Sequence, residues 1–132
     1  MADSEWMKKG KAMRTALFGE AAEAKVNATA YNTPGMEKFR EYAKEAVFGG
    51  LWAREGLDLK TRTLICVISD TVMGREEELA LHLRVALRQG WTEDELTEAI
   101  LHLAGYIGLP LVRGTMLKAG AVFEEIRAEG GA

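Results

Sequence analysis

Helical periodicity is the sequence feature that most limits how this chain can fold. In every long segment, apolar residues recur at three- and four-residue steps, the spacing that places them on one face of an α-helix. Pro34 and Pro110 are the only prolines, and both lie between helical patterns. No segment alternates polar and apolar residues as a half-buried strand would, apart from residues 64–69, which are embedded in helix signals. The chain is therefore predicted to be an all-α bundle of about six helices.

Capping and stop signals set the expected boundaries. Asp58 and Thr92 are residue types that start helices, and a glutamate three residues after Thr92 completes a capping box. Gly74 is expected to break one helix, Gly49-Gly50 to stop another, and Pro110 to open the last one at its first turn. The expected helices cover residues 4–17, 36–48, 59–73, 75–88, 93–107 and 110–128, with 20–33 weakly patterned and 51–57 expected as a loop.

Composition argues against several classes of protein. The 132 residues suit one domain, so a single domain over residues 1–132 is expected. A net charge of −3 without a basic block argues against nucleic-acid binding, and no apolar run is long enough for a membrane span. The N-terminus lacks the cationic and apolar regions of a signal peptide, so a cytoplasmic location is expected. The single cysteine, Cys66, allows neither an internal disulfide nor a Cys-x-x-Cys redox pair.

Three polar residues, Arg75, Glu78 and His82, are predicted to project onto the inner half of helix 75–88. Their three- and four-residue steps stack them in one stripe, so their side chains can touch. Burying a cation, a carboxylate and an imidazole costs free energy unless they are paired. The group is therefore either a satisfied structural network or an active site, in which Glu78 would fix the tautomer of His82 and raise its basicity.

The other polar candidates carry weaker signals. A metal site is not expected, because the stripe offers two ligands and Arg75 repels a cation. His102 is expected to be solvated or in a subunit contact, and Cys66 to be a small packed residue or a subunit contact. Arg54 follows Trp52 in the expected loop, where it is either a surface arginine stacked on its neighbour or an anion clamp at the mouth of a pocket.

Five segments in register resemble the 4-carboxymuconolactone decarboxylase family. They are residues 48–57, 61–64, 74–82, 90–96 and 106–110, and the resemblance spans nearly the whole chain. The family belongs to the alkylhydroperoxidase D-like superfamily of small all-α proteins that assemble as trimers or hexamers, so that fold and a homo-oligomer are expected. In the peroxidase branch a Cys-x-x-Cys pair precedes the histidine of this helix. Arg75 and Glu78 stand at those positions here, which implies the decarboxylase branch and no cofactor.

The resemblance also implies a reaction and its residues. The family removes a carboxylate from an unsaturated γ-lactone of the protocatechuate pathway, so the expected ligand is a small anionic lactone. His82 and Glu78 would be catalytic, whereas Arg75, Arg54 and Trp52 would bind the substrate. The sequence departs from the family pattern at Phe48 and over residues 24–35 and 111–114, where Arg113 would bind an extra anionic group or contact another subunit. Two alternatives stay open: another lactone chemistry, such as isomerisation or hydrolysis, and a non-catalytic oligomeric binding protein.

Overall fold

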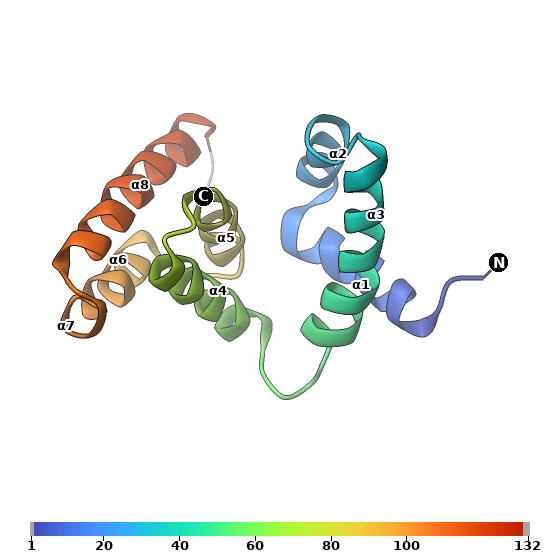
Figure 1. Cartoon of the computed structure of the whole chain (residues 1–132), viewed down its shortest axis with the longest axis horizontal. Coiled ribbons are helices and arrows are strands. Elements are labelled where there is room, and N and C mark those ends of the chain that lie inside the picture. The colour runs from blue at the N-terminus through green and yellow to red at the C-terminus, as the bar shows by residue number, and fades with distance from the viewer. Residues whose placement is uncertain (1, 131–132) are drawn as a thin grey trace. The chain divides into compact units, whose positions relative to one another are not determined.

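The computed structural model describes residues 2–130, which form helices and no strand, so the all-α prediction is confirmed. The elements are α1 (Glu5–Phe18), α2 (Glu20–Thr29), α3 (Pro34–Tyr42), the π-helix η1 (Ala43–Trp52), α4 (Leu59–Met73), α5 (Glu76–Arg88), α6 (Glu93–His102), α7 (Ala104–Ile107) and α8 (Leu109–Ala128) (Figure 1). They group into two compact units, Met1–Leu57 and Asp58–Ala132. The prediction of one domain over residues 1–132 stays a prediction. No helix in the described part is long and apolar enough to cross a membrane.

In the first unit, α1 packs against η1 at glycines. A Cβ atom on Gly49 would lie 1.8 Å from the Trp6 carbonyl oxygen, and one on Gly10 would lie 1.8 Å from the Lys44 carbonyl oxygen. Only glycine permits two helix backbones to come this close. The prediction that Gly49-Gly50 stops a helix is therefore wrong: η1 continues through both residues to Trp52, and the glycines serve packing.

A buried cation lies in the same unit. Arg14 is only 4% exposed, and its guanidinium lies within 5.8 Å of the ring centres of Phe18, Tyr31 and Phe48. Its Nε atom is 3.6 Å from a carboxylate oxygen of Glu23 on α2. The ion pair joins α2 to α1, and the cation–π contacts join Arg14 to η1 through Phe48 and to the segment after α2 through Tyr31.

Two boundaries in the first unit differ from the prediction. The weakly patterned residues 20–33 contain α2, which has no buried residue and so no apolar stripe to reveal it. The helix expected from residue 36 begins at Pro34, because the Thr33 side chain accepts a hydrogen bond from the Met36 N–H.

The second unit follows its local signals more closely. The Asp58 side chain accepts a hydrogen bond from the Thr61 N–H at the start of α4, and Gly74 ends that helix with a left-handed φ of 67°. Thr92 forms the expected capping box at the start of α6. The helix expected over 93–107 is divided at Leu103 into α6 and α7.

The core of the second unit is built from α4, α5, α6 and α8. α4 packs against α5, and both α5 and α6 pack against α8 (Figure 1). The buried side chains of this core are Val67, Leu79, Leu83, Ala86, Leu96, Ile100, Val112, Ala119, Val122, Phe123 and Ile126. This packing fixes the inner faces of α4 and α5 against each other, and those faces carry the polar pair described next.

Candidate active site

A carboxylate and an imidazole meet between α4 and α5. The Nδ1 atom of His82 lies 2.5 Å from Oδ2 of Asp70, a strong hydrogen-bond distance. Asp70 is buried at 6% exposure, whereas the His82 side chain keeps 23% of its surface exposed. Nε2 of His82 has no hydrogen-bond partner among residues 2–130. The imidazole is thus held from one side and open on the other.

The last turn of α4 places Asp70. Val67, Asp70 and Thr71 share the buried face of this helix. The Thr71 hydroxyl donates to the Val67 carbonyl at 2.8 Å, which satisfies its polar group locally. The Asp70 carbonyl accepts a hydrogen bond from the Arg75 N–H at 2.9 Å across the turn that joins α4 to α5. The backbone of Asp70 is therefore anchored where the chain reverses, and its side chain faces α5.

Burial and three neighbouring residues set the ionisation of Asp70. Burial raises the pKa of its carboxyl group, and this is the largest effect. The hydrogen bond from His82 and the charge of His82 lower the pKa of Asp70. The charge of Glu78 raises this pKa, and the charge of Arg75 lowers it. The result is a raised pKa for Asp70. All three residues of the sequence-predicted stripe thus act electrostatically on a fourth residue.

The prediction that all three residues of the stripe project inward is only partly confirmed. Arg75 and Glu78 are exposed, so the expectation that they project inward is wrong, whereas His82 is half-buried. Arg75 is the N-cap of α5 and not part of the helix, and Glu78 lies in the first turn, where the helix dipole favours negative charge. The carboxylate that contacts the imidazole is Asp70, which sequence reasoning missed. A carboxylate three residues after Val67 and directly before Thr71 carried the same inward-facing signal that identified His82.

Trp52 and Arg54 lie in the first unit. Trp52 is the last residue of η1 and is 8% exposed, so its placement in a loop is wrong. Its ring stacks on Phe48, with centres 6.2 Å apart. Arg54 follows in the turn after η1 and is exposed. Their role in substrate binding stays a prediction.

His102 and Cys66 are the two remaining candidates from the sequence. His102 is exposed, and its ring centre lies 5.4 Å from that of Tyr106. Cys66 is half-buried, and burial followed by the charge of Asp70 raises the pKa of its thiol to about 11. Among the described residues, no three His, Cys, Asp or Glu side chains are grouped as metal ligands.

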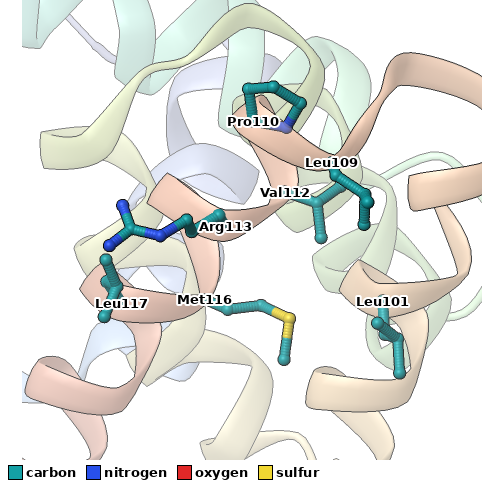
Figure 2. Close-up of a pocket in the computed structure, with 7 residues that line it drawn as sticks. All are labelled: Leu101, Leu109, Pro110, Val112, Arg113, Met116 and Leu117. Carbon is teal, nitrogen blue, oxygen red and sulfur yellow. The ribbon is translucent and has the colours of Figure 1, made fainter.

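A cavity of about 650 Å³ opens beside α8 in the second unit. Figure 2 shows Leu101 of α6 on one side and residues of α8 on the other. Arg113 is the charged member of an otherwise apolar lining: Leu101, Leu109, Pro110, Val112, Arg113, Met116 and Leu117. Neither Asp70 nor His82 lines this cavity.

Comparison with known proteins identifies the family. A model of the carboxymuconolactone decarboxylase family matches residues 36–121. The chain is 35% identical over 127 residues to 4-carboxymuconolactone decarboxylase of Acinetobacter baylyi, an alignment that covers 96% of this chain and 92% of that protein. It is 42% identical over 86 residues to the nitrosuccinic acid decarboxylase npaB of Metarhizium robertsii, covering 64% of this chain and 56% of that protein. An uncharacterized 15.0 kDa protein of Paracoccus denitrificans is 34% identical over 112 residues, covering 74% of this chain and 83% of that protein.

The chain therefore belongs to the carboxymuconolactone decarboxylase family, as its resemblance predicts. The matched region contains the Asp70–His82 pair and the exposed Arg75 and Glu78. Two of these relatives are named as decarboxylases, which supports a carboxy-lyase-like enzyme.

Proposed function

We propose that this protein decarboxylates 4-carboxymuconolactone, or a closely related carboxylated lactone, to the enol-lactone in aromatic-compound catabolism by the protocatechuate/β-ketoadipate route. The observation that carries the proposal is the half-exposed His82, hydrogen-bonded to buried Asp70 inside the family match. The identity to a 4-carboxymuconolactone decarboxylase over nearly the whole chain supports the choice of substrate.

The substrate itself supplies the electron sink. When the bond between ring carbon and carboxylate breaks, carbon dioxide leaves and its bonding electrons remain on the ring. Those electrons delocalise through the alkene to the lactone carbonyl oxygen, and a proton then adds to carbon. The protein must hold the anionic substrate, stabilise the growing negative charge and supply the proton.

Each task has a candidate residue. The guanidinium groups of Arg75 and Arg54 bind the carboxylates, for which their geometry suits bidentate hydrogen bonds. An N–H of His82 faces the developing oxyanion or delivers the proton to carbon. Glu78, one turn before His82, is the alternative proton donor. Trp52, at the end of η1 in the first unit, is a further candidate for contact with the substrate.

A second substrate class is favoured by the fungal relative named as a nitrosuccinic acid decarboxylase. A nitro group on the same carbon as the departing carboxylate accepts the electrons of decarboxylation, as the lactone carbonyl does through the alkene. The same cationic binding groups and the same proton donor would serve both reactions. Nitrosuccinic acid therefore belongs beside 4-carboxymuconolactone in the substrate test.

We also propose a homo-oligomer, a trimer or a hexamer, as the working form. Several large apolar side chains are exposed on the second unit, among them Leu109 at 69% and Leu117 at 61%. Exposed apolar patches of this kind mark interaction surfaces.

The decisive experiment measures carbon dioxide release from both substrates by the purified protein. His82→Ala should lower turnover by about 100-fold or more, the usual scale for losing an acid–base group. Arg75→Ala should also raise KM, because a carboxylate contact is lost. The matched control is His102→Ala, which removes the other histidine from an exposed position and should leave turnover unchanged.

Three results would contradict the proposal. Wild-type turnover by a folded His82→Ala protein would remove the catalytic role of this residue. Conversion of the lactone without carbon dioxide release would indicate an isomerase or hydrolase. Binding of the lactone without any conversion would indicate a binding protein. A melting curve of each variant shows whether a loss of turnover reflects lost folding.

A further inference from the structure

We propose that Asp70 is a positioning residue that keeps a proton on Nδ1 of His82 and leaves Nε2 as the atom that exchanges a proton with the substrate. The inference rests on the proposed function for its kinetic consequence. The arrangement of the pair itself can be tested without any substrate.

Hydrogen-bond chemistry fixes the direction. An ionised carboxylate has no proton to donate, so at the 2.5 Å separation the Nδ1 atom must carry the shared hydrogen. A neutral imidazole has one N–H, which leaves Nε2 as the basic atom. Nε2 has no hydrogen-bond partner among residues 2–130, and the side chain keeps a quarter of its surface open. The free nitrogen is thus the one that a ligand can reach.

Because Asp70 is buried, it can fix the orientation of the His82 ring better than Glu78 can. Asp70 is 6% exposed, on a helix that is packed against α5, so its side chain has few alternative positions. Glu78 is exposed on the same helix as His82, where a flexible side chain loses conformational entropy when it is held. The charged and titratable groups that act on Asp70 are His82, Glu78 and Arg75, and the thiol of Cys66 lies within its electrostatic reach.

In the reaction, the doubly protonated imidazole donates from Nε2 to the ring carbon. The Nε2–H bond breaks, the carbon–hydrogen bond forms, and the neutral imidazole keeps its proton on Nδ1. The carboxylate of Asp70 accepts the hydrogen bond from Nδ1 throughout and prevents the ring from turning. Asp70 gains and loses no proton in this step.

The first test reads the tautomer of the wild-type protein and needs no substrate. Nitrogen NMR shifts of His82, measured at a pH where the imidazole is neutral, show which nitrogen bears the proton; spectra of His82→Ala assign the signals. The expected result is a protonated Nδ1 and an unprotonated Nε2. The reverse tautomer, in which protonated Asp70 donates to Nδ1, would overturn the proposal.

The second test compares three carboxylate-to-amide variants. Asp70→Asn should shift the neutral ring toward the Nε2–H tautomer, because the new amide can donate to Nδ1. It should lower kcat by about 10- to 100-fold with little change in KM, since orientation and not binding is lost. Glu78→Gln should keep the Nδ1–H tautomer. Asp94→Asn, at an exposed position of α6, should keep both the tautomer and kcat.

These readouts separate the two proposals. If the wild-type protein decarboxylates neither substrate, the proposed function fails, and the tautomer alone decides on Asp70. If the wild type is active but Asp70→Asn keeps full kcat and the Nδ1–H tautomer, the positioning role is wrong. If Asp70→Asn does not fold, the wild-type tautomer still decides.

Discussion

The buried carboxyl group of Asp70 makes the free energy of unfolding depend on pH. Its pKa in the folded protein is raised above the ordinary value of 3.8, so the folded state holds this proton more tightly than the unfolded chain does. The stabilisation associated with that proton is complete below 3.8 and is lost as the pH rises through the raised pKa.

We therefore expect the Tm of the wild type, relative to that of Asp70→Asn, to fall as the pH rises across this window. Thermal unfolding of both proteins at a series of acidic to neutral pH values measures the difference. Asp94→Asn serves as the reference for general pH effects. A wild-type advantage that grows with pH would mean that the folded pKa is lowered and that burial does not dominate.

The pKa of the Cys66 thiol depends in part on the charge of the Asp70 carboxylate. Its thiol has a pKa of about 11, raised mainly by burial and then by the charge of Asp70. We expect slow alkylation at neutral pH, because the thiolate is the reactive form. Asp70→Asn should lower the pKa of Cys66, since one negative charge is removed, and a pH titration of the alkylation rate measures this on the chain's single cysteine.

Cys66→Ser should keep turnover, because one thiol without a partner cannot run a dithiol cycle. Loss of activity in a well-folded Cys66→Ser protein would place the thiol in the mechanism. An unchanged Cys66 pKa in Asp70→Asn would instead show that the carboxylate is too well screened to act on the thiol.

At the scale of helices, the close approach of α1 and η1 gives a sharp stability test. Gly49→Ala would bring a methyl group to 1.8 Å from the Trp6 carbonyl oxygen, so the two backbones must separate. We expect a loss of about 1–3 kcal/mol in the free energy of unfolding, the range for overpacked sites. Gly56→Ala, with nothing within 4 Å of the new atom, is the control and should change stability by less than about 0.5 kcal/mol. Chemical denaturation of both variants measures the difference, and equal stabilities would refute the packing role.

Local sequence pattern predicts some helix ends correctly and fails where a helix end depends on distant contacts. Asp58, Thr92 and Gly74 act on backbone groups within a few residues, so their helix ends are predictable from local pattern alone. The role of Gly49 depends on a helix that lies far away in sequence, and the local pattern indicated a stop instead.

The same distinction holds for the candidate site, where the sequence identifies His82 but not its partner Asp70. His82 was identifiable because its own helix has clear apolar and charged faces. Its partner Asp70 lies on another helix, and which residue of α4 faces the imidazole is decided by how two helices pack. Arg75 and Glu78 are exposed because the first turn of α5 extends beyond the packed region, an end effect that periodicity alone does not reveal.

At the scale of the whole molecule, the exposed apolar surface predicts self-association. The cavity beside α8 is almost wholly apolar, and Leu117, which lines it, is 61% exposed. We expect a trimer or hexamer by light scattering at micromolar concentration. Leu117→Glu should favour smaller species if this face is buried between copies, whereas Glu124→Gln, an exposed change on the same helix, should leave the assembly unchanged. A monomeric wild-type protein would refute the assembly.

The short path between Asp70 and His82 has a consequence for how such a protein can change over time. The two residues are 12 positions apart, and one reversal of the chain at Gly74 joins their helices. Closing so short a segment costs little chain entropy. The spacing between carboxylate and imidazole is thus inherited as one continuous piece of sequence. Substitutions elsewhere in the chain can then alter substrate preference while the Asp70–His82 pair, and with it the proposed proton transfer, is kept.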